Sequence, residues 1–183
     1  MEQATTILTA MVKKARQGDE DAKAWLYRQY SETMFNICMR MAGNKVNAED
    51  LLQDAFIKAF TNLSQLKQPE IFGGWLRRIT VIECLRHGKR TINWKQLDDE
   101  RQSVTEDDPG PWWADISMAL VNEAIRELPN GCRQVFVLYA LEDYRHQDIA
   151  KELGISESTS KSQYQRARQL LKDQLTKKTV HHG

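Results

Sequence analysis

The residues best suited to chemistry in this chain are small polar and basic side chains that follow Gly154. They are Ser158, Thr159, Lys161, Ser162, Gln165, Arg166 and Arg168. Four of them, at i, i+1, i+4 and i+5 counted from Lys161, share one stripe if the segment is helical. Lys and Arg can bond guanine O6 and N7, Gln can bond adenine, and Ser can serve several bases. The remaining three suit phosphate oxygens. The chemistry that this stripe offers is therefore recognition of duplex DNA.

The segment 147–166 predicts the two short helices that would position this stripe. Ile149, Ala150 and Leu153 recur at helical spacing and form an apolar face. Gly154 then ends the first helix, and Ser156 can cap the next one through its hydroxyl. A helix-turn-helix has this layout and lays its second helix in the major groove. Helical hairpins with a glycine turn also occur in proteins that do not bind DNA, so both readings stay open here.

A second group of residues lies on a helix predicted to run from near Gly74 to about Thr91. It combines aromatic and basic side chains: Phe72, Trp75, Arg78, Arg86, Lys89 and Arg90. Single-stranded nucleic acid binds by stacking on aromatic rings beside a basic track. One side of the helix must be buried, so we expect Phe72 and Trp75 to be core residues more than stacking platforms. The basic residues are the stronger candidates.

A third group lies on the helix predicted for residues 47–63, which Asn47 would cap. Its buried side is rich in Leu, Ala and Phe, and its other side shows Asp50, Gln53, Asp54 and Ile57. Such a row can bind a basic partner or can be a solvated helix face. The residues alone favour the solvated face.

Length and composition point to a globular protein. The chain has 183 residues, 41% of them hydrophobic and 28% charged, enough for one ordinary domain or two small ones. No apolar run approaches the roughly 20 residues of a membrane span. The N-terminus lacks the basic-then-apolar order of a secretion signal. We therefore expect a cytoplasmic protein without membrane insertion.

The sequence carries no pattern typical of catalysis. It has no glycine-rich phosphate loop, nucleophile elbow or His/Glu zinc pattern. Cys38, Cys84 and Cys132 are odd in number and widely spaced, which fits reduced core thiols better than a disulfide framework. Cys84 and His87 can share a helix face, but two ligands do not make a metal site. We expect no enzyme activity, no cofactor and no metal.

Charge is segregated along the chain although the net charge is only +1. Residues 1–92 hold 14 Lys and Arg against 10 Asp and Glu, residues 93–117 hold 2 against 7, and residues 118–183 hold 10 against 8. The middle segment shows no helical or strand periodicity and contains a Pro-Gly-Pro run, so it is predicted to be a linker. Trp112 and Trp113 at its end are expected to pack on the second domain, with a partner anchor as the alternative.

The predicted fold is all-α, with two small helical domains joined by an acidic linker. The first domain covers residues 1–92, the linker 93–117, and the second domain, which contains the helix-turn-helix, 118–183. No strand pattern competes with the helical periodicity. Each domain is near the size at which a core is only marginally stable alone, so a partner is expected to contribute stability.

Three sequence motifs occur in a fixed order along the chain and indicate a more specific function than DNA binding. They are AEDLLQDAF at 48–56, FGGWLRRI at 72–79, and ELP at 127–129 followed by the helix-turn-helix and RAR at 166–168. In order and spacing the chain resembles the extracytoplasmic-function (ECF) sigma factors of bacterial RNA polymerase, which have two domains. The resemblance covers roughly residues 20–92 and 116–175.

The resemblance implies a role for each group of residues. In that family the helix like 48–63 docks on a coiled coil of the polymerase beta-prime subunit, through positions here held by Asp50, Gln53, Asp54 and Ile57. The segment like 66–90 captures the −10 element, which adds Ile82 to the second group. The helix-turn-helix reads the −35 element. The implied partners are core RNA polymerase (the beta-prime coiled coil and the beta flap), promoter DNA, and an anti-sigma factor that clamps the two domains.

The acidic residues of the linker have a counterpart in that family. They are Asp98, Asp99, Glu100, Glu106, Asp107 and Asp108. In the family this connector threads toward the active-site cleft and the RNA exit path and mimics nucleic acid. A solubilising tether explains the same composition, and the two readings are equally open.

The chain departs from the family pattern at two positions. Ile82 stands where many members carry an asparagine that contacts a flipped base, and loss of the amide removes a donor and an acceptor. Base choice at the −10 element is therefore in doubt, whereas stacking and phosphate contacts are retained. Ser160 stands where many members place a core valine. A buried serine needs a partner, such as a carbonyl one turn back, and a small stability cost is expected.

Two alternatives to an ECF-type sigma factor remain at this stage. A stand-alone helix-turn-helix regulator that never binds polymerase would usually dimerise to read paired half-sites. The chain shows no separate dimerisation helix or ligand domain, which counts against it. A sigma-like protein that binds polymerase but melts promoters poorly is the other alternative, because of Ile82.

Overall fold

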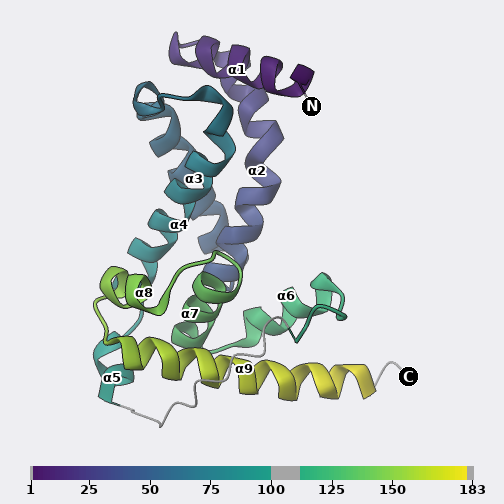
Figure 1. The fold of residues 1–183 in the computed structure, drawn as a ribbon, viewed down its shortest axis with the longest axis vertical. Coiled ribbons are helices and arrows are strands. Elements are labelled where there is room, and N and C mark those ends of the chain that lie inside the picture. The colour runs from purple at the N-terminus through teal and green to yellow at the C-terminus, as the bar shows by residue number, and fades with distance from the viewer. Residues whose placement is uncertain (1, 100–111, 181–183) are drawn as a thin grey trace. The chain divides into compact units, whose positions relative to one another are not determined.

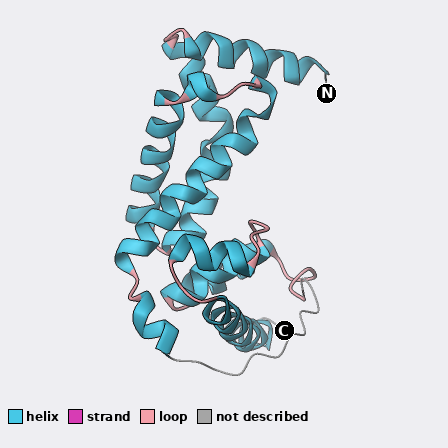
Figure 2. Cartoon of the chain, turned by 60° about the vertical axis from the view of Figure 1, so that its left-hand side comes forward, coloured by secondary structure: helices cyan, strands magenta, loops and turns pink. Residues whose placement is uncertain are grey.

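The computed structural model describes residues 2–99 and 112–180, and within these ranges the regular structure is helical with no strand (Figures 1 and 2). The α-helices are α1 (Glu2–Arg16), α2 (Glu20–Ala42), α3 (Lys45–Thr61), α4 (Phe72–Thr91), α5 (Trp94–Asp99), α6 (Met118–Glu127), α7 (Asn130–Ala140), α8 (His146–Leu153) and α9 (Glu157–Val180). Two short 3-10 turns, η1 (Leu63–Gln65) and η2 (Pro69–Ile71), lie between α3 and α4. The all-α prediction is confirmed.

The chain divides into two compact units, which are described separately. The first comprises residues 1–39 and 45–84, and the second comprises residues 40–44 and 85–183. The predicted domain limits at residues 92 and 117 stay predictions. Both units contain helices that the hydrophobic periodicity had indicated.

Aliphatic and aromatic side chains from α1 to α4 fill the core of the first unit. Leu26, Met34, Phe72 and Leu76 are all buried. Arg16, at the end of α1, donates from Nε to the carbonyl oxygen of Leu63 at 3.2 Å and so joins α1 to η1. Burial of this apolar set is the main stabilising contribution, at about 25 cal/mol per Å² removed from water.

The start of α3 corrects one sequence prediction. Asn47 was expected to cap this helix, but α3 begins at Lys45 and places Asn47 inside its first turn. Gly43, with φ at +78°, ends the preceding helix, so the chain reverses before Asn47 is reached. Lys45 then pairs with Glu49 one turn later at 3.5 Å, an arrangement that favours the earlier start.

The second unit contains the helix-turn-helix with the predicted turn chemistry. Gly154 has φ at +72° and ends α8 in the left-handed conformation, where a side chain would be strained. Ser156 caps α9, because its hydroxyl accepts the backbone N–H of Thr159 at 3.1 Å. Ile149 and Leu153 on α8 are buried, as the spacing indicated. The turn therefore forms from local residue preferences.

The segment predicted to be a linker contains more structure than expected. Residues Trp94–Asp99 form α5, and the Trp94 side chain is buried with its Nε1 donating to the Gly88 carbonyl at 3.3 Å. A Cβ placed on Gly131 would lie 2.5 Å from Leu97, so α5 approaches the start of α7 closely. Burial of a tryptophan outweighs the weak helical signal of this short segment. The acidic residues Glu100, Glu106, Asp107 and Asp108 lie outside the described residues.

Trp113 packs against the second unit, as expected. Its ring meets Phe136 on α7 edge-to-face at 5.2 Å between centroids, and its side chain is buried. Trp112 contacts Trp113 at 5.4 Å and is half-buried. The aromatic pair therefore extends the core of this unit.

Candidate functional site

Helix α9 presents a polar stripe whose members were predicted to read duplex DNA. Ser158 and Arg166 are exposed, and Lys161 and Gln165 are half-buried. Lys161 Nζ lies 3.1 Å from the Glu157 carboxylate one turn earlier. That pair is exposed, so the pairing is weak and easily exchanged for a phosphate or a base edge. These four side chains remain available for contact.

Three of the predicted DNA-contact residues are buried instead. Thr159, Ser162 and Arg168 are only 2, 8 and 6% exposed. The Thr159 hydroxyl lies 2.7 Å from that of Ser156, and the Ser162 hydroxyl donates to the Thr159 carbonyl at 3.0 Å. The Arg168 guanidinium lies over the Tyr164 ring at 5.8 Å. We therefore correct the prediction: this structure gives these three residues a packing role in the second unit.

Aromatic packing decides which side of α9 faces outward. Tyr164 stacks on Phe136 at 5.9 Å and tilts against Tyr139 at 4.6 Å, and both partners belong to α7. Because Tyr164 points inward, its neighbours Lys161 and Gln165 on the same helix point to the side. The Phe136–Tyr164 contact thus sets the orientation of Lys161 and Gln165.

Ser160 has a partner that the sequence did not suggest. Its hydroxyl is fully buried and lies 2.9 Å from Nδ1 of His146, at the start of α8. The His146 ring also stacks on Tyr139, with centroids 4.1 Å apart. The expected carbonyl partner is therefore replaced by an imidazole from the other helix of the helix-turn-helix. This bond ties the two helices of the helix-turn-helix together at Ser160.

One exposed residue of α9 was missed from the sequence. Gln169 lies one turn beyond Gln165 and is exposed. Its amide nitrogen donates to Asp173 at 3.0 Å. The i+4 spacing from Gln165 is the signal that could have identified it.

Helix α4 carries the second predicted group on a single face. Trp75, Arg78, Ile82, Arg86 and Lys89 follow one another at intervals of three or four residues and so line one stripe. The three basic residues are exposed, and Trp75 and Ile82 are half-buried. We call this set the α4 stripe. An aromatic and an aliphatic side chain beside three cations suit a single strand.

Phe72 and Arg90 lie to the side of the α4 stripe. Phe72 is fully buried and meets Tyr30 edge-to-face at 5.2 Å, so it cannot stack on a base. The prediction that Phe72 contacts DNA is therefore corrected, and its expected role as a core residue is confirmed. Arg90 is exposed in the last turn of the helix.

Helix α3 forms one wall of a hollow that contains three of the residues predicted to bind polymerase. Asp50, Gln53 and Ile57 line it together with Tyr27 of α2, and its volume is about 590 Å³. Ile57 is 59% exposed and so presents an apolar side chain to solvent beside the hollow. Asp54 is exposed on the same helix but is not part of the lining.

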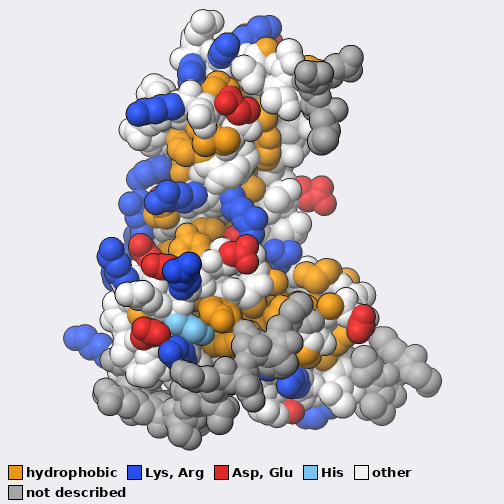
Figure 3. Space-filling model, viewed as in Figure 1, with side chains coloured by type: hydrophobic (Ala, Val, Ile, Leu, Met, Phe, Trp, Pro, Cys, Tyr) orange, Lys and Arg blue, Asp and Glu red, His pale blue; other side chains and the backbone are white. Residues whose placement is uncertain are grey.

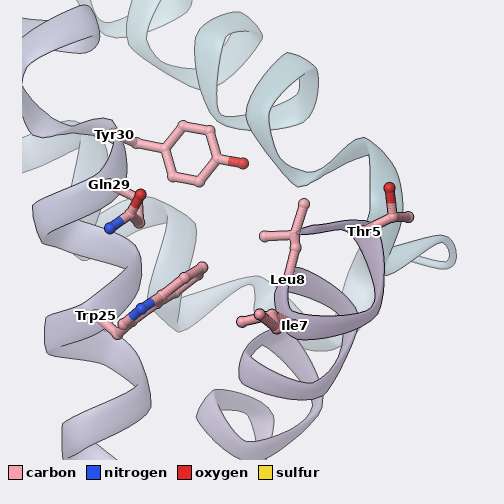
Figure 4. A pocket seen from close by; sticks show the side chains of 6 residues that line it. All are labelled: Thr5, Ile7, Leu8, Trp25, Gln29 and Tyr30. Carbon is pink, nitrogen blue, oxygen red and sulfur yellow. The ribbon is translucent and has the colours of Figure 1, made fainter. Parts of the chain in front are cut away.

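A second hollow of about 460 Å³ lies between α1 and α2. Trp25, Gln29 and Tyr30 of α2 face Ile7 and Leu8 of α1 across it (Figure 4). Burial raises the pKa of the Tyr30 phenol. None of the predicted site residues lines this hollow.

The surface of the first unit mixes apolar and basic side chains. In the view of Figure 3, hydrophobic side chains reach the surface of this unit between Lys and Arg side chains. Within residues 2–99 and 112–180, no helix is both long enough and apolar enough to cross a membrane. The side chains described there include no group of three or more metal-binding residues.

Comparisons with known proteins match both units. The family model for sigma-70 region 2 matches residues 26–92, and that for sigma-70, region 4 matches residues 118–171. The ECF RNA polymerase sigma factor SigE of Mycolicibacterium smegmatis is 34% identical over 169 residues, which cover 87% of this chain and 65% of SigE. The ECF RNA polymerase sigma factor SigW of Bacillus subtilis is 30% identical over 176 residues, which cover 90% of this chain and 94% of SigW.

Two solved structures share the fold at lower identity. CnrH in complex with the cytosolic domain of CnrY has a TM-score of 0.50 and 21% identity, covering 92% of this chain and 97% of CnrH. RpoE of Bartonella quintana in complex with the anti-sigma factor NepR has a TM-score of 0.50 and 19% identity, covering 84% of this chain and 96% of RpoE.

The His146–Ser160 bond gives a first testable prediction. We expect Ser160→Ala and His146→Ala to destabilise the protein non-additively, with a coupling of about 1 kcal/mol in a double-mutant cycle, because each change removes the same bond. Denaturant unfolding of the four proteins in the cycle measures this coupling.

A matched pair calibrates the cycle. Ser160→Ala combined with Thr176→Ala should be additive, because Thr176 is exposed, lies about four helical turns beyond Ser160 on α9, and donates its hydroxyl to the Lys172 carbonyl. If Ser160→Ala and His146→Ala were also additive, the His146–Ser160 bond would contribute nothing to the stability of the helix-turn-helix.

Proposed function

Because this chain belongs to the extracytoplasmic-function (ECF) family of RNA polymerase sigma factors, we propose that it binds core RNA polymerase and directs it to promoters. The observation that carries the proposal is the pair of exposed, DNA-compatible stripes on α9 and α4, in a chain that matches both sigma regions. The protein would act by binding energy alone, without a catalytic residue. Such a function requires access to chromosomal DNA, and hence a cytoplasmic location.

Docking on polymerase is assigned to the exposed face of α3. Asp50 and Asp54 supply negative charge, Gln53 a neutral donor and acceptor, and Ile57 an apolar anchor beside the hollow. An anchor with surrounding polar groups is the usual anatomy of a protein interface. The acidic pair suits a basic partner surface, for which we propose the beta-prime coiled coil. The second unit would meet the beta flap.

Reading of the −35 element is assigned to α9. Lys161, Gln165 and Arg166 are the side chains with base-specific chemistry that stay accessible, and Ser158 lies at the start of the same helix. Gln169 and Lys172, one and two turns further on, suit phosphates. The second helix of a helix-turn-helix contacts base edges mainly through its N-terminal residues, which agrees with this division.

Capture of the melted −10 element is assigned to the α4 stripe. The half-buried Trp75 can present one ring edge or face, and Arg78, Arg86 and Lys89 can follow the phosphates. Ile82 lies in the middle of the stripe and offers contact area without a hydrogen bond. We therefore propose that the α4 stripe holds the strand with little choice of base at Ile82.

An anti-sigma factor completes the set of proposed partners. CnrH and RpoE were solved in complex with CnrY and with the anti-sigma factor NepR, respectively. We propose that a partner of this class also holds the present chain inactive.

Polymerase binding is the first property to test. Labelled protein titrated against bacterial core RNA polymerase should give stoichiometric binding by anisotropy, and Asp50→Lys with Asp54→Lys should weaken it at least about tenfold, since like charges would then face each other. Asp21→Lys with Glu32→Lys, at exposed positions of α2, is the charge-matched control and should bind normally.

The outcomes separate the remaining readings. Normal binding by the α3 double variant would remove α3 from the interface. Lack of binding by the folded wild-type protein in the micromolar range would favour a stand-alone helix-turn-helix regulator.

Arg166 should carry part of the −35 choice. Arg166→Ala is expected to cost about 1–3 kcal/mol in promoter binding and to relax the preference at one or two positions, because a bidentate base contact is lost. Lys172→Ala removes one positive charge further along α9 and should weaken binding to all promoter sequences alike. Selection from a randomised −35 library distinguishes the two, and an unchanged base preference would exclude Arg166 from the readout.

Ile82 should limit promoter opening. On a duplex template Ile82→Asn is expected to raise run-off transcription, since the amide restores a base-edge donor and acceptor. On a template with a pre-melted −10 region the wild-type protein should recover more activity than the variant. If pre-melting fails to rescue the wild-type protein, Ile82 does not limit melting.

A further inference from the structure

Two buried cysteines of the first unit lie side by side although they are far apart in the sequence. Cys38 on α2 and Cys84 on α4 are separated by 46 positions, and their sulfur atoms are 4.0 Å apart. Both side chains are completely buried, and both are free thiols in this structure. Neither residue has a part in the polymerase or DNA contacts proposed above.

The separation of these sulfur atoms is close to that required for a disulfide bond. A disulfide has a sulfur–sulfur distance of about 2.05 Å and Cβ atoms about 3.8 Å apart. Starting from 4.0 Å, the two sulfur atoms must approach each other by about 2 Å to reach bonding distance. Two adjacent helices of one packed unit keep the pair together.

We propose that Cys38 and Cys84 are a peroxide-sensitive pair that closes to an intramolecular disulfide. One thiolate attacks the oxygen–oxygen bond of hydrogen peroxide and becomes a sulfenic acid, releasing hydroxide that takes up a proton to form water. The second thiol gives up its proton, and its thiolate attacks the sulfenic sulfur and expels hydroxide, which takes up that proton to form the second water. Two thiols and one peroxide thus give one disulfide and two waters. This chemistry does not depend on the sigma function.

The third cysteine is the natural internal control. Cys132 belongs to the second unit and lies 3.2 Å from the amide oxygen of Gln163. Burial raises the pKa of its thiol to about 11, although the nearby Arg166 charge opposes the shift. The neighbour of the Cys132 sulfur is an amide oxygen, which cannot form a disulfide, so Cys132 should stay reduced.

Closure of the pair would connect α2 to α4. A cross-link across 46 positions removes conformational freedom from the unfolded chain, which stabilises the first unit. Disulfides in reducing compartments are usually transient and redox-sensing. The bond would also fix the helix that carries the α4 stripe to its neighbour in the core.

Peptide mapping of the full-length protein tests the proposal directly. The protein is treated with hydrogen peroxide, quenched with N-ethylmaleimide in denaturant, and digested with trypsin. The expected product joins the peptide of residues 29–40, which contains Cys38, to that of residues 79–86, which contains Cys84. The intact monomer should lose two hydrogen atoms, and the peptide of residues 127–133 should carry maleimide on Cys132.

Variants and unfolding confirm the assignment. Cys132→Ala should form the same cross-link, whereas Cys38→Ala and Cys84→Ala should not, and the wild-type mapping stands even if either of the last two fails to fold. Oxidation should raise the Tm of the first unit by at least about 5 °C, reversed by dithiothreitol. Maleimide on both Cys38 and Cys84 after peroxide treatment, or a cross-link that includes Cys132 or a second chain, would overturn the proposal.

Discussion

The contact between Tyr164 and Phe136 is the constraint on which the surface proposed to face DNA depends. Tyr164 belongs to α9, and its ring stacks on Phe136 of α7 at 5.9 Å with the planes 17° apart. An aromatic pair of this kind contributes beyond the area that it buries. Since a helix is rigid, fixing Tyr164 inward fixes every other residue of α9 in rotation. Lys161 and Gln165 are partly accessible because the Tyr164 ring is buried on the other side of α9.

The parts of the fold that follow from local chemistry were predictable. Gly154 takes a left-handed conformation that most side chains avoid, and Ser156 satisfies a backbone N–H of the next helix, so residue type alone indicates the turn. Trp113 was expected in a core because a large ring is costly to leave in water, and it lies there. The periodicity of apolar residues indicated the helices in the same way.

The parts that depend on neighbouring helices were not predictable from one sequence. Ser162 and Arg168 share the polar character of their accessible neighbours, and only the packing of the second unit shows that they are buried. Trp94 stabilises a short helix inside a segment whose composition indicates a linker. The approach of Cys38 to Cys84 is a property of two helices 46 positions apart. Spacing within one element carries no information about such contacts.

Two modest DNA contacts carried by one chain can together give specific promoter binding. An aromatic stack is worth about 1–3 kcal/mol per base, and a bidentate base contact about the same. In the proposed assignment Ile82 offers no hydrogen bond to a base, so base choice would rest mainly on α9. Linking the contacts through one chain makes the second binding step intramolecular and raises its effective concentration. Low base choice at the −10 element is therefore compatible with accurate promoter binding, provided that α9 binds the −35 element in the same complex.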